Sequence, residues 1–254
     1  MKVFVCDNRF EDMMTCIYDA WEAALKCGHD NVYLMRGPVL QENLFDEYIY
    51  VENNSEKAEK VVRSVINKMG TEAIHFVQYG TLSNEDDALD VIYRFMIRGF
   101  KIGHGITNAL TEPAVVRLME IKRNVGNEAH LFKEFLRFAS VDDKVYVAHI
   151  EPKCNVVETV GRHFVDRMPS EHFMIVDDTR ALAFVHPKDS ECYLQYLTPE
   201  ELTAVKRTDL VRDEYSSMWK TFFDTIAIKE RINPRCQRGH MPLWMRKHAV
   251  EFQD

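Results

Sequence analysis

The chain has 254 residues, of which 46% are hydrophobic and 28% charged, the composition of an ordinary globular protein with a sizeable core. Its formal net charge of −8 argues against indiscriminate nucleic-acid binding, because phosphate repels a negative surface, so any such binding has to be local. No apolar run approaches the roughly 18 residues of a membrane span, and the opening stretch MKVFVCDNRFED is too short for a signal peptide, which predicts a cytoplasmic protein.

The first half of the chain alternates short apolar runs with amphipathic stretches. The expected elements are a strand at 2–6, a helix opened by Asp7-Asn8, a strand at 48–53, a helix capped by Ser55, and a helix from the capping box at 83–86 to the glycines of 99–105. The helix from Ser55 carries Lys57, Lys60, Arg63 and Lys68 opposite its apolar stripe. We interpret that charged face as solvated.

The second half has the clearest strand signals. The expected elements are a long helix from Pro113 to about Ala139, a strand at 145–150, a helix at 155–168, a hairpin of 172–177 and 181–186, and a last helix at about 213–231. These elements predict an α+β protein that is helix-rich, with a small, mostly antiparallel sheet.

The cysteines offer no metal site of recognisable spacing. They are Cys6, Cys16, Cys27, Cys154, Cys192 and Cys236. Since no two of them form a CxxC pair or a CxxxCxxC cluster, a zinc ribbon or an iron–sulfur site is disfavoured. We therefore expect neither a bound metal nor another cofactor.

Two stretches, 130–138 (HLFKEFLRF) and 161–180, gather charged side chains that would line a polar pocket. The candidates are His130, Arg137, His163, Arg167, Asp177 and Arg180. An aspartate at a strand tip that pairs with arginine or histidine is typical of such a pocket. The alternatives remain open: an amphipathic helix with ion pairs one turn apart, and ion pairs that hold a helix to the hairpin.

The end of the chain is basic. Between Lys229 and His248 there are six Lys or Arg residues and one acid, Glu230. We call residues 229–248 the basic segment. Asn233-Pro234 predicts the end of the last helix, whose apolar stripe (Trp219, Phe222, Phe223 and Ile226) we expect in the core. The residues up to His240 would then be extended.

Arginines beside amide and aromatic side chains suit phosphate contact and base stacking. The nucleic-acid-binding candidates are Lys229, Arg231, Arg235, Gln237, Arg238 and Trp244. The alternative is a solubilising tail that packs over acidic residues elsewhere on this acidic chain.

Three motifs together resemble the DUF4130 family, described as proposed DNA metabolism proteins. They are HxFxxFxRF at 130–138, HFxxRxPxxxFxIxDxxR at 163–180 and WKxFFxTIAIKERxNPRxQ at 219–237. The resemblance is best over residues 84–246, which divides the chain into an N-terminal αβ segment (1–83) packed on a DUF4130-like domain with the basic segment (84–254). It also implies an association with a radical SAM protein and with a uracil-DNA-glycosylase-superfamily domain.

Three functions follow as hypotheses. In the first, the chain is a DNA-binding component of DNA repair or modification that works with a radical SAM partner. In the second, it is an enzyme acting on a nucleotide or damaged base, with His163 as general acid/base oriented by Asp177. In the third, it is a non-catalytic adaptor whose basic segment docks on an acidic partner.

Overall fold

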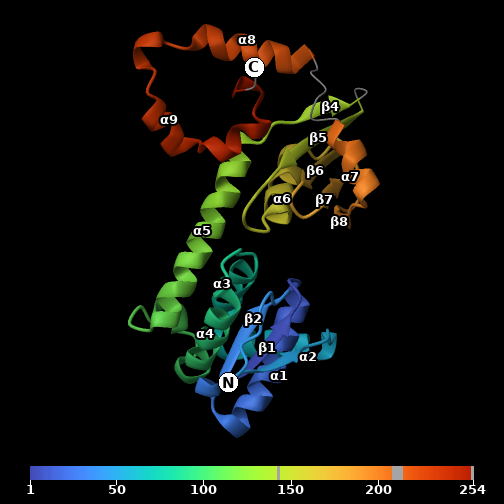
Figure 1. Cartoon of the computed structure of the whole chain (residues 1–254). Coiled ribbons are helices and arrows are strands. Elements are labelled where there is room, and N and C mark those ends of the chain that lie inside the picture. The colour runs from blue at the N-terminus through green and yellow to red at the C-terminus, as the bar shows by residue number, and fades with distance from the viewer. Residues whose placement is uncertain (142–143, 208–213, 253–254) are drawn as a thin grey trace. The chain divides into compact units, whose positions relative to one another are not determined.

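The computed structural model describes residues 1–141, 144–207 and 214–252, without the side chains of residues 214–216 and 229 (Figure 1). The chain divides into two compact units, Met1–Gly126 and Asn127–Asp254. The helix-rich α+β class is confirmed. None of the described helices combines the length and apolarity needed to cross a membrane.

The expectation of one small, mostly antiparallel sheet is wrong. The described residues form a wholly parallel sheet of order β2-β1-β3 and a mixed sheet of order β4-β5-β6-β7-β8. The physical reason is that two helices, Phe10–Cys27 and Val157–Arg167, each connect neighbouring strands, and a helical crossover returns the chain parallel to the strand it left.

The first unit builds its parallel sheet around a central strand that is buried on both faces. Its elements are β1 (Lys2–Cys6), α1 (Phe10–Cys27), η1 (His29–Asn31), β2 (Val32–Arg36), β3 (Glu47–Tyr50), α2 (Ser55–Met69), α3 (Thr71–Thr81), α4 (Ala88–Ile102), η2 (Ile106–Asn108) and the first part of α5 (Pro113–Phe135). The core packs α1, α2, α3 and α4 with the sheet, through residues such as Phe4, Met14, Val65 and Phe95. β1 therefore reads as one apolar run, KVFVC, as parallel strands covered by helices do.

Local chemistry places the start of α2 and the end of α4 close to where they were expected, whereas α4 begins only at Ala88 and the predicted capping box at 83–86 does not cap it. The cap of α2 is Asn54 rather than Ser55, since the Asn54 side chain accepts a hydrogen bond from the Lys57 N–H at 3.0 Å. α4 ends at Gly103, whose φ of 81° lies in the left-handed region that favours glycine.

The second unit holds the mixed sheet and the C-terminal helices. Its elements are the end of α5, β4 (Ala139–Val141), β5 (Val145–Ile150), α6 (Val157–Arg167), β6 (Phe173–Asp177), β7 (Leu182–His186), β8 (Tyr193–Tyr196), α7 (Pro199–Lys206), α8 (Glu214–Ile226), η4 (Lys229–Arg231), α9 (Pro234–His240), η5 (Leu243–His248) and η6 (Val250–Phe252). β5 is parallel to β6, because α6 forms the crossover between them, whereas β6 and β7 form the expected antiparallel hairpin.

The two faces of the mixed sheet are covered by different helices, α6 and α7 (Figure 1). Gly161 of α6 lies directly against the ring of Phe184. On the opposite face, Leu202 and Val205 of α7 pack against a small cluster that includes Ala183. Because neighbouring residues on a strand point to opposite faces, Ala183 and Phe184 of β7 supply one side chain to each layer.

Two expectations for the end of the chain are wrong. Asn233-Pro234 does not lead into an extended segment but opens α9, because Asn233 accepts a hydrogen bond from the Cys236 N–H at 3.1 Å and Pro234 occupies the first helical position. The stripe of α8 is not buried core either. Trp219, Phe222 and Ile226 are exposed, and only Phe223 is partly buried, with its ring 5.8 Å from that of Phe252.

Candidate functional site at the carboxyl ends of β5 and β6

The parallel pairing of β5 and β6 brings two acidic residues side by side. Ile150 pairs with Asp177, so the residues that follow these partners, Glu151 and Asp178, leave the sheet at the same edge. The carboxyl ends of adjacent parallel strands are the place where open α/β sheets bind their ligands. This edge of the sheet is therefore a candidate ligand-binding site.

The chain after β5, residues 151–154, forms an exit loop that is anchored from two sides. The buried Glu128 carboxylate accepts hydrogen bonds from the N–H groups of Lys153, at 2.7 Å, and Cys154, at 2.8 Å. Arg180 donates to the carbonyl oxygens of Pro152, at 3.0 Å, and Lys153. Charge-assisted bonds of this kind fix the backbone more firmly than neutral ones.

Asp177 links the exit loop to the hairpin. Its side chain is fully buried, and it accepts hydrogen bonds from the Thr179 and Arg180 N–H groups and, at 2.8 Å, from the Arg180 guanidinium. Burial raises the pKa of the Asp177 carboxyl, although Arg180 and the backbone donors act in the opposite direction. The expected Asp177–Arg180 pair is thus present, and its contacts hold two strand ends in place.

Beside this network lies a buried histidine–carboxylate pair. His149 Nδ1 lies 3.0 Å from Asp178 Oδ1, and the two side chains are only 1% and 5% exposed. The ring of His248, from η5, stacks on that of His149 with centroids 6.1 Å apart. Glu151 completes the group, with its Oε1 3.8 Å from His248 Nε2.

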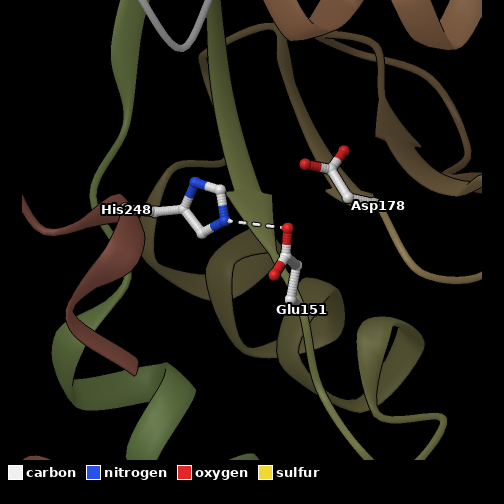
Figure 2. Close-up of side chains that lie close together, drawn as sticks. All are labelled: Glu151, Asp178 and His248. Atoms are coloured by element: carbon white, nitrogen blue, oxygen red, sulfur yellow. Dashed lines mark ion pairs between the residues drawn. The ribbon is translucent and has the colours of Figure 1, made fainter. Parts of the chain in front are cut away.

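Figure 2 shows Glu151, Asp178 and His248 around one small space, with the Glu151 carboxylate between the other two. Lys247 also pairs with Glu151, and its side chain is 61% exposed, so the group opens to solvent on this side. An arrangement of two carboxylates and imidazoles can hold a cation or move a proton. We call Glu151, Asp178 and His248, with His149 behind them, the strand-end cluster.

Sequence reasoning missed all four members of the strand-end cluster. A signal was present, because His149-Ile150-Glu151 and Asp177-Asp178 place polar residues at the ends of two apolar runs. The expected antiparallel sheet gave no reason to place these residues together, since only parallel strands bring both of these ends to one edge. His248 is about a hundred residues further on and no local pattern connects it to them.

The predicted pocket is only partly assembled. Among the contacts of the described residues, none joins His163 to Asp177. His130 lies 3.0 Å from Glu134 on the exposed face of α5, as in the amphipathic alternative, and Arg137 binds Glu251 at 2.6 Å. Arg167 is exposed. Partial burial, and then the charges of Lys133 and Arg167, lower the pKa of His163.

The predicted nucleic-acid-binding residues lie on an exposed surface. Arg231, Arg235, Gln237 and Arg238 are all exposed, and none of the ion pairs among the described residues involves these three arginines. Trp244 is 39% exposed, with the Lys153 ammonium 5.9 Å from its ring. The Lys229 side chain lies outside the described residues.

The model of DUF4130, a domain of unknown function, matches residues 86–251. A search of curated proteins found no match. The matched range includes the whole of the second unit's sheet, the strand-end cluster and the basic segment, and it covers more than half of the chain. The chain therefore belongs to the DUF4130 family.

Proposed function

We propose that the chain is a nucleic-acid-binding component of DNA repair or modification that works with a radical SAM protein. The observation that carries the proposal is the exposed row of arginines on η4 and α9. The link to DNA metabolism and to a radical SAM partner rests on the motifs shared with the family.

The geometry of α9 suits a phosphate backbone. Arg235 and Arg238 are three residues apart and therefore share one face of the helix, while Arg231 precedes it on η4. Exposed guanidinium groups bind phosphate oxygens in a bidentate manner, and the partly exposed Trp244 ring offers a surface on which a base can stack. Concentrating positive charge here lets one surface attract phosphate while the acidic remainder of the chain repels it.

Replacing Arg231, Arg235 and Arg238 together with alanine is expected to weaken binding of a DNA oligonucleotide at least tenfold. The slope of log affinity against log salt should fall by about 2 to 3, because each lost phosphate contact removes about 0.7–0.9 from it. Fluorescence anisotropy at several salt concentrations, with single- and double-stranded oligonucleotides, measures both quantities.

The matched control is the alanine variant of Lys60, Arg63 and Lys68, which removes the same three charges from the solvated face of α2. It should leave the slope nearly unchanged. Equal losses of DNA affinity in the two triple variants would mean that only overall charge matters. An unchanged DNA affinity in the variant of Arg231, Arg235 and Arg238 would refute the proposal.

A second candidate is an adaptor that docks through α8, rather than through the basic segment as hypothesised above, and the surface of α8 favours it. Met218, Trp219, Phe222 and Ile226 are exposed there, Phe222 to 52%. Several large apolar side chains exposed on one helix are typical of a protein-binding surface, and aromatic residues dominate the energetics of such surfaces. In this role the chain would bind the radical SAM protein through α8 and would not itself catalyse a reaction.

Replacing Phe222 with aspartate is then expected to abolish co-purification with the radical SAM protein, because a charge in an apolar interface loses its hydration without gaining a partner. Affinity pull-down of the two co-expressed proteins measures this. The control is Leu194→Asp, at an exposed apolar position on β8. Equal retention of the partner by both variants and the unaltered chain would exclude α8 as the docking surface.

A further inference from the structure

We propose that Glu151, Asp178 and His248 bind a divalent first-row transition-metal ion at the carboxyl ends of β5 and β6. One ligand atom from each of these residues lies within 4.8 Å of the other two (Figure 2). His248 belongs to the basic segment, but Arg231, Arg235 and Arg238 are not among the ligands, and the proposal does not depend on nucleic-acid binding.

The ligand atoms lie somewhat farther apart than they would around a bound ion. His248 Nε2 and Glu151 Oε1 are 3.8 Å apart, too far for a hydrogen bond. Two atoms bound to one ion at about 2.0–2.2 Å each are about 3–3.6 Å apart. Side-chain movements of about 1 Å therefore bring all three ligands onto one ion.

The surroundings of the ligands resemble the outer shell of a metal site. His149 contacts Asp178 Oδ1 at 3.0 Å, and this contact orients the carboxylate, as outer-shell partners of metal ligands do. Glu151 belongs to the exit loop, whose backbone is held by Glu128 and Arg180. Two of the three ligands are thus positioned by contacts that are in place before any ion binds.

The ligand set selects the class of ion. Two carboxylates alone would suit Mg²⁺ or Ca²⁺, but an imidazole nitrogen favours transition metals such as Mn²⁺, Fe²⁺ and Zn²⁺. Three protein ligands leave at least one position for water or another oxygen ligand, as in catalytic rather than structural sites. The cysteine spacing, which argued against a metal, does not bear on this set because it contains no cysteine.

Lys247 is the group that an incoming ion has to displace. Its ammonium pairs with Glu151, and its positive charge cancels part of the negative potential that would attract the ion. The lysine side chain is largely exposed and can turn into solvent. Removing its charge should therefore strengthen metal binding, an effect that loss of folding cannot imitate.

The test is isothermal titration of the full chain, stripped with a chelator, with Mn²⁺ and Zn²⁺, and absorption spectroscopy with Co²⁺. We expect one saturable site, weakened at least tenfold in Glu151→Gln and in His248→Gln and strengthened several-fold in Lys247→Gln. His149→Gln should weaken it about 10–100-fold, as loss of an orienting partner does.

The control is Glu158→Gln, which removes a partly exposed carboxylate of α6 that pairs with Arg162 and is not a member of the strand-end cluster. The affinity of this variant for Mn²⁺ and Zn²⁺ should equal that of the unaltered chain. Binding that survives in both Glu151→Gln and His248→Gln would belong to other residues and would overturn the proposal. The absence of saturable binding below millimolar concentrations of both ions would do the same.

Discussion

Replacing Asp177 with alanine is expected to lower the free energy of unfolding by about 3 kcal/mol. Breaking a buried charge pair by removing one partner costs about 3–5 kcal/mol, and the lower end applies because Arg180 is partly exposed. The alanine variant also leaves the Thr179 and Arg180 N–H groups without their acceptor. Urea denaturation followed by circular dichroism measures the loss.

Asp177→Asn separates the charge from the hydrogen bonds. Asparagine keeps an oxygen that can accept from the two N–H groups, and the raised pKa of Asp177 means that the negative charge is itself costly there. We therefore expect asparagine to restore only the part of the loss that comes from these two hydrogen bonds, about 1 kcal/mol, because it breaks the charge pair as alanine does. Asp166→Ala, on the exposed side of α6, is the control and should be close to neutral. Equal destabilisation by alanine and asparagine would show that the charge pair, not the backbone bonds, is what matters.

Gly161→Ala is expected to destabilise the second unit by about 2 kcal/mol, even though alanine is the better helix former. A β-carbon at this position would lie 2.3 Å from two atoms of the Phe184 ring. The ring is buried and stacked on that of Phe173, so it has little room to move. Overpacking of this kind costs about 1–3 kcal/mol or more and outweighs the roughly 1 kcal/mol gained from helix propensity.

Gly126→Ala provides the contrast, because a β-carbon on this residue of α5 meets no atom within 4 Å. That variant should be as stable as the unaltered chain or slightly more so. A smaller ring partner, in the double variant Gly161→Ala with Phe184→Leu, should recover part of the stability lost in Gly161→Ala alone. If Gly161→Ala melted at the same temperature as the unaltered chain, α6 and β7 would not be in close contact.

The strands and helices with strong patterns could be predicted from the sequence. β1 and β5 are mostly apolar runs, and β6 and β7 flank a short polar turn, so each was expected within a residue or so of its position. β2, β4, β8, α3 and α7 were missed. β8 is an edge strand whose residues are all exposed, and α3 begins immediately after the glycine that ends α2. Such elements are stabilised by tertiary contacts that no local pattern records.

The candidate site could not be predicted, for a different reason. Its residues form no recognisable motif along the chain, and they come together only because β6 runs parallel to β5. That direction depends on α6 packing back onto the sheet, with Gly161 against Phe184. The same helix was predicted, yet the hairpin that follows suggested an antiparallel sheet.

The anchoring of the exit loop also bears on the thermodynamics of anything that binds at the strand ends. A flexible loop would lose conformational entropy on closing around a ligand, and that loss would be subtracted from the affinity. Here Glu128 and Arg180 already hold residues 152–154, so the ordering has taken place during folding. The binding enthalpy of an occupant would be offset mainly by its own loss of hydration, and its association should be fast, with no loop closure to wait for.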